Sequence, residues 1–382
     1  MRALLIYPIN ADQKEARGIL NKMEQQAAAF RGLVDHATQV CNSRAGLIVD
    51  GKQVSTYRMR GRRANPLNHY AAFYRHILTK VRVEEYDLAY IRYPLTTPFF
   101  LMFLSRLRAR RPDLKVVLEI AAYPYRQEIT DLRRQWLLGS DVALARFLPR
   151  YVNLVVTFFG QEEIFGIRCL NTTNGVDVST QPRRTAQAGS SDGTVRLLGV
   201  ANLAPWHAYD RVVRGIAAHG ATPPRFEFHV VGDGPSAPAL RALSEELGVT
   251  DRVRFHGVRT GEELDTLYER ADLALGSLGM HRLGHGTASS LKTREYCARG
   301  IPFVMGGPDE DFPPALPFVH RVTSDESPLD LASIARFHEG LREMADIPGR
   351  MRDYAEQRLT WRAKLAPVLD RLRRANDQRS DR

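Results

Sequence analysis

Short apolar runs alternate with longer segments of helical periodicity along the first half of the chain. Each run is rich in Val, Ile, Leu and aromatic residues and is bounded by polar or turn residues, as buried strands are. Strands that alternate with helices indicate an α/β protein with a mostly parallel, doubly wound sheet. The predicted strands are residues 3–7, 88–93, 116–120 and 153–158, and predicted helices include residues 19–33 and 98–111.

The alternation stops and then restarts in the second half. Residues 177–194 lose periodicity and are rich in Gly, Ser and Arg, which favours a linker. The next predicted strands are residues 195–200, 226–231, 253–256, 273–275 and 301–305. We expect two Rossmann-like, doubly wound domains that face each other across a cleft, because open α/β sheets bind ligands at the carboxyl ends of their strands.

A last predicted helix, residues 349–374, is long enough to cross back to the first domain. A chain of 382 residues exceeds what one core usually holds, which also favours two domains. The expected parts are residues 1–175, residues 176–350 and, for the C-terminal helix, residues 351–382.

One stretch joins a loop rich in glycine and histidine, residues 276–286, to a short helix that Gly300 ends. On this helix Lys292, Glu295 and Arg299 lie three or four residues apart and share a face. That face is either a solvated row of ion pairs or a binding surface. The preceding loop favours binding, because backbone N–H groups before a helix can cradle phosphate oxygens.

Composition places the chain among ordinary globular proteins, with 44% hydrophobic and 25% charged residues. The most apolar run, residues 98–104, is too short to span a bilayer. We expect no targeting peptide, because a predicted strand begins at residue 3. Cys41, Cys169 and Cys297 are far apart and lack metal-binding spacing, which fits free thiols in a reducing compartment. We therefore expect a cytoplasmic protein.

The net charge of +11 is unevenly distributed. Residues 1–175 hold 26 Lys and Arg against 15 Asp and Glu, whereas the rest of the chain holds 28 of each. The densest basic runs are residues 58–63 and 106–111, and the second follows the apolar run of residues 98–104. This pattern predicts peripheral binding to an anionic membrane surface; an acidic glycan acceptor or solubility alone are the alternatives. No interleaved base-stacking aromatic residues accompany the charge, so we expect no nucleic-acid partner.

An ordered series of motifs runs through the second half. The motifs are Asn174-Gly-Val-Asp177, Trp206-His-Ala-Tyr-Asp210, Val231-Gly-Asp-Gly-Pro235, Glu263-Leu-Asp-Thr-Leu-Tyr268 and Lys292-Thr-Arg-Glu-Tyr-Cys-Ala-Arg-Gly-Ile-Pro302. In this order the motifs resemble nucleotide-sugar-dependent glycosyltransferases of the two-Rossmann-domain (GT-B) type, in particular retaining family 4 members of polysaccharide assembly. In the first half, residues 86–94 and 119–125 also resemble that group.

The resemblance implies roles for particular residues. Glu295 matches the second glutamate of the family's pair, whose carboxylate accepts hydrogen bonds from the ribose hydroxyls of the donor. The first glutamate falls at Thr287. The arginine and lysine that hold the diphosphate in the family fall at Asn202 and His207, so another residue has to supply positive charge.

A departing nucleoside diphosphate gains negative charge, which cations or N–H donors stabilise most in the transition state. The candidates for this role are His207, Arg282, His285 and Lys292. The expected catalytic residues are His207, Lys292 and Glu295. The expected donor-binding residues are Gly18, Asn202, Gly232, Gly234, Val258, Arg282, His285, Thr287, Ser290, Leu291, Lys292 and Glu295. The expected acceptor-binding residues are Tyr123, Tyr125 and Glu128.

We expect no metal and no cofactor other than the nucleotide sugar as co-substrate. Asp309-Glu-Asp311 could hold a divalent ion, but it lies between Pro308 and Pro313, and we interpret it as solvated loop charge. The expected function is transfer of a hexose from a nucleotide-diphosphate sugar to a glycan or lipid-linked glycan, with retention of configuration. The alternative is a catalytically silent nucleotide-sugar-binding or scaffold protein, because the acid expected at position 287 is absent.

Overall fold

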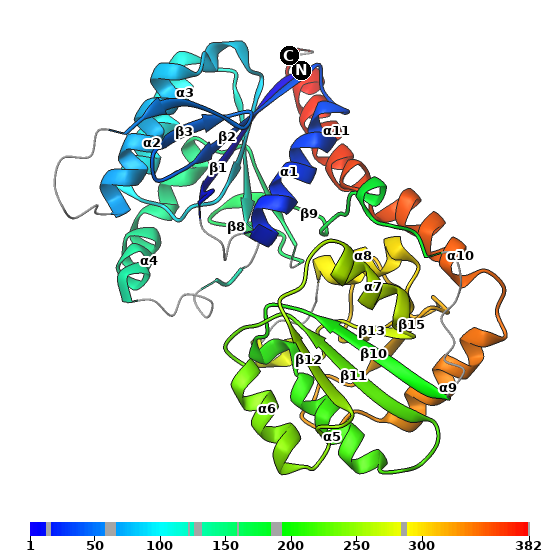
Figure 1. The fold of residues 1–382 in the computed structure, drawn as a ribbon. Coiled ribbons are helices and arrows are strands. Elements are labelled where there is room, and N and C mark those ends of the chain that lie inside the picture. Colours follow the sequence, from blue (N-terminus) through cyan, green and yellow to red (C-terminus); the bar gives the residue numbers. More distant parts are fainter. Residues whose placement is uncertain are drawn as a thin grey trace. The chain divides into compact units, whose positions relative to one another are not determined.

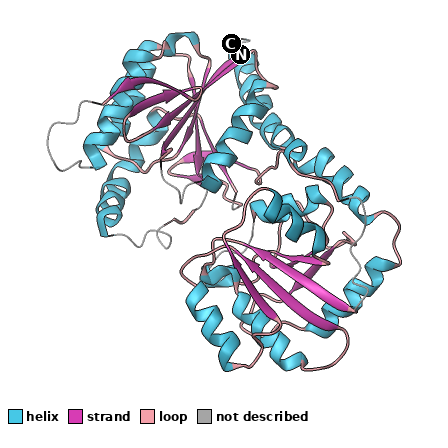
Figure 2. Cartoon of the chain, viewed as in Figure 1, coloured by secondary structure: helices cyan, strands magenta, loops and turns pink. Residues whose placement is uncertain are grey.

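The structure of the protein, a computed structural model, divides into two compact units (Figure 1). The first unit contains Met1–Thr173 and Trp361–Arg382, and the second contains Asn174–Thr360. Each unit is a sheet flanked by helices (Figure 2). The structure describes residues 1–12, 17–57, 66–120, 123–125, 132–158, 160–184, 193–283 and 289–380.

The first unit is built on a nine-stranded sheet. Its strands are β1 (Arg2–Asn10), β2 (His36–Asn42), β3 (Gly46–Val49), β4 (Lys52–Thr56), β5 (Leu88–Arg92), β6 (Lys115–Ile120), β7 (Leu154–Thr157), β8 (Glu163–Ile164) and β9 (Ile167–Asn171). They lie in the order β4-β3-β2-β1-β5-β6-β7-β9-β8. The strands from β2 to β9 in that order are parallel, and antiparallel hairpins add β3 and β4 at one edge and β8 at the other.

Helices bury both faces of this sheet. They are α1 (Arg17–Arg31), α2 (Pro66–Lys80), α3 (Pro98–Arg110), α4 (Leu132–Leu144) and α11 (Trp361–Ser380). Side chains of β1 alternate between the faces, as strand geometry requires. Leu4 packs with Phe73 of α2 in one buried cluster. Leu5 packs with Met23 of α1 and Leu365 of α11 in the other, so the C-terminal helix joins the first unit, as expected.

Helix α3 contains the apolar and basic segment that the sequence assigns to a membrane. Phe100, Phe103 and Leu104 are buried in the core. Arg108 donates to the carbonyl of Tyr151. Arg110 donates to the carbonyl of Leu78, and Arg111 donates to the carboxylate of Asp87. Met102 of the same segment is 44% exposed, so only part of its apolar half faces solvent while the rest covers the sheet. Peripheral binding to a membrane stays a prediction. The basic run of residues 58–63 lies outside the described residues.

The second unit is a six-stranded, fully parallel sheet. Its strands are β10 (Thr194–Val200), β11 (Arg225–Val231), β12 (Val253–Gly257), β13 (Leu273–Leu275), β14 (Phe303–Gly306) and β15 (Val319–Val322). The spatial order β12-β11-β10-β13-β14-β15 is the 3-2-1-4-5-6 order of a Rossmann fold. The five strands expected from the sequence are thus present and parallel, with β15 in addition.

The helices of this unit are α5 (Tyr209–His219), α6 (Ala237–Glu246), α7 (Glu262–Arg270), α8 (Leu291–Arg299), α9 (Leu331–Arg342) and α10 (Ile347–Tyr354). The single long helix expected at the C-terminus is interrupted. A π-helical turn (Ala355–Leu359) follows α10, and Thr360 is extended and bridges Val176 before α11 begins. The chain thus leaves the second unit at a strand-like residue and not along a continuous helix.

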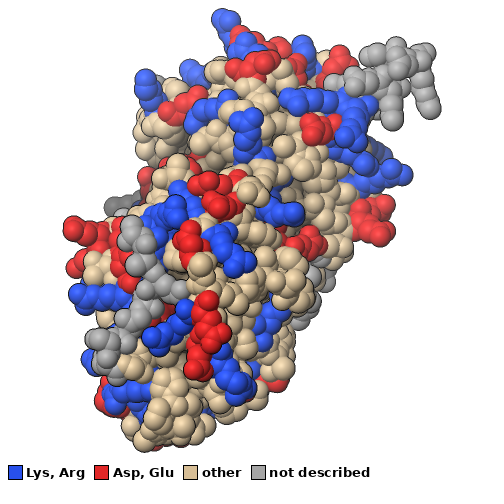
Figure 3. Space-filling view, turned by 90° about the vertical axis from the view of Figure 1, so that its right-hand side faces the viewer, with Lys and Arg blue, Asp and Glu red and all other residues tan. Residues whose placement is uncertain are grey.

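The surface is charged but mixed in sign. On the face in Figure 3, basic and acidic side chains are interspersed. Within the described residues, no helix is both long and apolar enough to cross a membrane.

Candidate functional site

The strand order of the second sheet reverses between the neighbouring strands β10 and β13. In open α/β sheets, ligands bind outside the carboxyl ends of the strands at such a point. Residues 201–208 follow β10 there, and residues 276–290 follow β13 and lead into α8. The backbone N–H of Leu278 donates to the carbonyl of His207 at 3.2 Å, which ties the two loops together. The topology thus brings Asn202 and His207 of the first loop and Arg282 and Ser290 of the second to one edge of the sheet.

Lys292 is the only lysine between residues 174 and 360, and it lies in the first turn of α8. Its Nζ is buried and has no hydrogen-bond partner in the part of the chain that the structure describes. Nζ lies 5.5 Å from the centroid of the Tyr209 ring. Burial lowers the pKa of Lys292 to about 7, against the opposing effect of the Glu295 carboxylate. An amine that can gain a proton near neutral pH suits an anionic ligand.

Glu295 lies three residues further along the same helix. Burial raises the pKa of its carboxyl, while the charges of Arg299 and Lys292 lower it. Arg299 does not pair with Glu295: its Nη1 lies 2.7 Å from Asp265, and its Nε donates to Gln181. Among the described residues the Glu295 carboxylate accepts no hydrogen bond. The alternative of a row of ion pairs along this helix is therefore wrong, and both Lys292 and Glu295 are left without the partners that a stabilising role would give them.

His207 ends the short 3₁₀ helix Pro205–His207 that follows β10, and it is buried. Its Nδ1 accepts a hydrogen bond from the backbone N–H of Ala204 at 3.1 Å. Burial, reinforced by the charge of Lys292, lowers the pKa of His207 to about 2. The ring is therefore neutral with its proton on Nε2, since Nδ1 is occupied as an acceptor. It can serve as an N–H donor but not as a cation.

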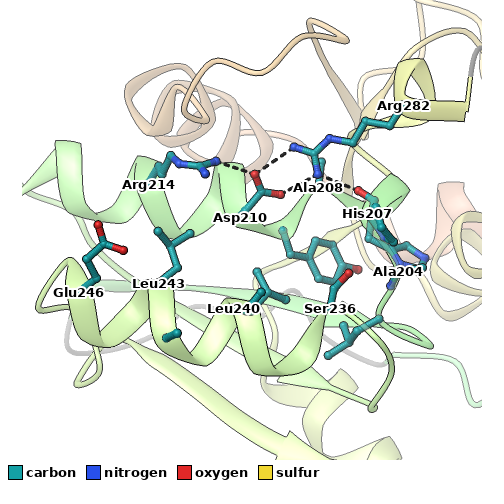
Figure 4. A pocket seen from close by; sticks show the side chains of 15 residues that line it. Ala204, His207, Ala208, Asp210, Arg214, Ser236, Leu240, Leu243, Glu246 and Arg282 are labelled. Carbon is teal, nitrogen blue, oxygen red and sulfur yellow. Dashed lines mark hydrogen bonds and ion pairs between the residues drawn. The ribbon is translucent and has the colours of Figure 1, made fainter.

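All five N–H groups of the Arg282 guanidinium face acceptors of the protein. Nη1 and Nη2 each lie 2.9 Å from an oxygen of Asp210, and Nη1 also donates to the carbonyl of Pro205 at 2.8 Å (Figure 4). Nε donates to Glu326 at 2.9 Å, and Nη2 donates to the same carboxylate. These bonds raise the pKa of Arg282. Arg282 has no N–H group left for a donor phosphate, so it fixes the loop after β13 onto α5 instead of contacting the ligand.

A cavity of about 440 Å³ extends from these residues between α5 and α6 (Figure 4). His207 and Arg282 line one end of this cavity, Leu240 and Leu243 line its floor, and Glu246 lines the far end. The cavity adjoins the candidate site and is mostly apolar.

Two glycines bring the loops after β10 and β11 into close contact. A Cβ on Gly232 would lie 1.8 Å from the carbonyl oxygen of Ala201, and one on Gly234 would lie 2.8 Å from Oδ1 of Asn202. Both glycines have positive φ, 121° and 148°. Only glycine satisfies these two conditions together. Asn202 is exposed beside them, and Val258, at the end of β12, is 65% exposed. These four expected residues line the same edge of the sheet.

The other expected site residues fall into three groups. Ser290 and Leu291 begin α8, where Ser290 is the N-cap residue without a side-chain capping bond. Gly18, Tyr123 and Tyr125 belong to the first unit. Glu128, His285 and Thr287 lie outside the described residues.

The interpretation of Asp309 and Asp311 as solvated loop charge is wrong. Asp309 is buried and holds the buried guanidinium of Arg294 through both of its oxygens, at 2.5 and 2.6 Å. Asp311 bonds the same guanidinium at 2.6 Å. The two carboxylates neutralise a buried cation of α8.

Residues 194–310 match the family model described as glycosyl transferases group 1. This segment runs from β10 through β14 and contains Asn202, His207, Lys292 and Glu295. Gly18, Tyr123, Tyr125 and Glu128 lie outside it. A search of curated proteins gave no match to this chain.

Several solved structures share the fold of the whole chain. HepE of Anabaena, solved in complex with UDP and also with UDP-glucose, is 18% identical, with a TM-score of 0.60 for the UDP complex over 97% of this chain and 100% of that chain. Sucrose-phosphate synthase of Thermosynechococcus elongatus is 14% identical, with a TM-score of 0.63 over 99% and 100%. The lipopolysaccharide outer core galactosyltransferase WaaB is 14% identical, with a TM-score of 0.58 over 97% and 100%. The chain has the GT-B fold of two Rossmann-like domains, as the sequence predicts.

The structure also shows residues near the site that the sequence does not reveal. Asp210 and Glu326 lie 116 positions apart in the chain, and Arg282 bridges them. Asp210 belongs to a motif that the sequence singles out, but its partner cannot be inferred from spacing. Glu326 has no sequence signal, because it lies in a loop after β15.

Proposed function

We propose that this protein is a retaining hexosyltransferase that moves a hexose from a nucleotide-diphosphate sugar to a glycan or lipid-linked acceptor in polysaccharide biosynthesis. One observation carries the proposal: in the part of the chain that the structure describes, the buried Nζ of Lys292 and the half-buried carboxylate of Glu295 share a face of α8 without a hydrogen-bond partner, in a segment that matches group 1 glycosyl transferases. Buried charged groups are costly unless they are paired. A ligand that supplies both a diphosphate and ribose hydroxyls would pair both groups.

The roles follow from the chemistry of each group. The ammonium of Lys292 stabilises the diphosphate as it departs, and the Nε2–H of His207 donates to one of its oxygens. The Glu295 carboxylate accepts hydrogen bonds from the ribose hydroxyls. In a front-face reaction the leaving phosphate oxygen takes the proton of the acceptor hydroxyl, so no protein base is needed. The glycosidic bond to the acceptor then forms on the face from which the diphosphate leaves, and configuration is retained.

The charge on Lys292 also performs the task for which other enzymes use a divalent ion, so we expect activity to persist in EDTA. No cofactor beyond the nucleotide sugar is part of the proposal. The free thiols of Cys41, Cys169 and Cys297 fit a reducing compartment, which supports a cytoplasmic protein. Peripheral attachment to the inner face of the membrane is proposed on the charge of residues 1–175, and not on α3.

Two experiments test the proposal. Calorimetry against UDP-glucose, GDP-mannose and ADP-glucose measures donor binding, and a coupled assay measures release of nucleoside diphosphate with and without a membrane extract as acceptor. We expect one donor to bind and release to depend on the extract. Binding without release under every condition would favour the catalytically silent alternative, and failure to bind any nucleotide sugar would refute both.

A further inference from the structure

The first unit contains a second, larger cavity, of about 710 Å³, next to the loop after β6. Tyr123 and Tyr125 come from this loop, and Phe165 comes from the turn between β8 and β9. Val142 of α4 and Arg146 of the following 3₁₀ segment Ala145–Arg150 line the cavity as well. The volume is within the range of small-molecule sites, about 300 to 1,000 Å³.

The aromatic wall of this cavity is held by one buried carboxylate. Asp141 is 2% exposed and accepts hydrogen bonds from the hydroxyls of Tyr93 and Tyr125. It also accepts the backbone N–H of Thr96 at 2.6 Å. Burial is the main cause that raises the pKa of Tyr93 and Tyr125, so both stay protonated as donors to Asp141. The hydroxyls of Tyr93 and Tyr125 and the Asp141 carboxylate are therefore hydrogen-bonded to one another and are not free to bind a ligand.

The surface that lines the cavity is mostly apolar. The Tyr123 ring stands edge-on to Phe165, with centroids 5.9 Å apart and an interplanar angle of 88°. The Tyr125 ring lies 6.0 Å from that of Tyr93. A sugar ring would need several free donors and acceptors beside a stacking face, whereas this wall offers mainly apolar surface. The occupant favoured by the wall is a hydrocarbon chain.

The rim of the cavity is basic. Arg146 lines the cavity, and its guanidinium lies 4.9 Å from the centroid of the Phe147 ring. Arg150 lies 5.1 Å from the same centroid. Both arginines are exposed, and in the part of the chain that the structure describes neither pairs with a carboxylate. Val142 is 58% exposed beside them. A mostly apolar cavity with the unpaired guanidinium of Arg146 in its lining is complementary to a chain that ends in an anion.

We propose that this cavity binds the phosphate-bearing end of a single lipid, with the chain against the aromatic wall and the phosphate on Arg146. As the acceptor site of the enzyme, the cavity rests on the proposed function, and it then specifies a lipid-phosphate-linked acceptor. The lipid binding itself does not require that function. Residues 1–175 hold 26 basic and 15 acidic residues, and this positive excess favours binding of a negatively charged phosphate.

The test is calorimetry of the full chain with monomeric alkyl phosphates, from hexyl to decyl. Affinity should rise with chain length, by at most about fourfold for each methylene that the cavity buries. Arg146→Gln should lower the affinity for decyl phosphate by roughly two- to fivefold and leave the affinity for decanol unchanged. Val142→Asp, a substitution at an exposed position, should weaken both ligands. Arg75→Gln, which changes an exposed arginine of α2, is the matched control and should change neither.

Several outcomes would overturn the inference. They are equal affinity for inorganic phosphate and decyl phosphate, absence of binding by the native chain, and native affinity in both cavity variants when their melting temperatures match that of the native protein. Binding of UDP-glucose, GDP-mannose and ADP-glucose is measured on the same samples. A chain that binds one of these donors but not decyl phosphate refutes the lipid site and leaves the proposed function standing. A chain that binds decyl phosphate but none of the three donors refutes the proposed function and leaves the lipid site standing.

Discussion

Replacing Lys292 by Met should stabilise the folded protein and at the same time weaken diphosphate binding. The Met side chain has similar length and can pack on the Tyr209 ring, but it brings no charge into a buried site. Most substitutions of buried residues destabilise a protein. An increase in stability would therefore be a specific sign that Lys292 is retained for function and not for folding.

The magnitude follows from the pKa of Lys292, which burial lowers from 10.5 to about 7. At 1.36 kcal/mol per pKa unit, the folded state loses up to about 4 kcal/mol at pH 7 by holding this amine. Because the folded pKa lies below the unfolded one, the penalty is absent above pH 10.5. It grows as the pH falls from 10.5 to 7 and is complete below 7. The advantage of the Met variant should therefore be largest at pH 7 and smallest near pH 10.

Urea unfolding of the native protein and of Lys292→Met at pH 7 and pH 10 measures this difference. Lys80→Met is the control, since Lys80 is an exposed residue of α2 and its replacement should change stability by less than about 0.5 kcal/mol. Calorimetry then compares UDP with uridine. The Met variant should lose about tenfold or more in affinity for UDP and little for uridine.

Binding of UDP to the native protein near pH 7.5 should also take up a proton, because the diphosphate favours the ammonium form of Lys292. The uptake is measured by repeating the titration in buffers of different ionisation enthalpy, and it should be absent in the Met variant. A Met variant that is less stable than the native protein at pH 7 and binds UDP equally well would refute this account of Lys292.

Three further predictions concern the second unit. Glu295→Gln should weaken donor binding by about ten- to hundredfold in calorimetry, since hydrogen bonds to a charged group contribute about 1.5 to 3 kcal/mol; Glu263→Gln, at a 70% exposed carboxylate, should change it little. Arg294→Met leaves two carboxylates without their cation and should cost about 3 to 5 kcal/mol in urea unfolding, and a loss below 1 kcal/mol would contradict the buried ion pair. The rings of His229 and His256 are hydrogen-bonded at 3.0 Å, and burial lowers the pKa of both. The stability that their neutral forms contribute is therefore present above pH 6.5 and is lost as the pH falls below that value. His256→Gln should flatten this acid-side decline in a melting-temperature profile.

The periodic parts of the fold are the parts that the sequence predicts well. Strand β13 is a continuous apolar run, as buried parallel strands are because both of their faces are covered. Strands β10 and β11 are mostly apolar but are interrupted by Arg196, Glu227 and His229. The hairpin strands β3 and β4 escape prediction, since they are short and β4 is largely exposed at the sheet edge. The C-terminal helix is expected as one piece, but its interruption at Thr360 has no marker such as proline or glycine at that position.

In the candidate site, too, the sequence predicts the local arrangement but not the contacts between distant residues. The spacing of Lys292 and Glu295 places them on one face of a helix, which a sequence can predict. The state of each group depends on residues distant in the chain. Arg299 leaves Glu295 unpaired because it bonds Asp265, a residue of α7. Arg282 is unavailable to a ligand because Asp210 and Glu326 converge on it from two other elements, and no local pattern records that convergence.

Two buried cations of α8 show what distinguishes a structural charge from a functional one. Arg294 stays protonated under all ordinary conditions, so the fold supplies two carboxylates, Asp309 and Asp311, as permanent partners. Among the described residues Lys292 has no such partner, and burial brings its pKa to about 7. An arginine at that position would carry an uncompensated charge whenever the site is empty. Under the proposed function, a lysine can lose its proton in the empty site and regain it when the diphosphate binds. Apart from Lys292 and its histidines, the second unit has only arginine as a basic residue.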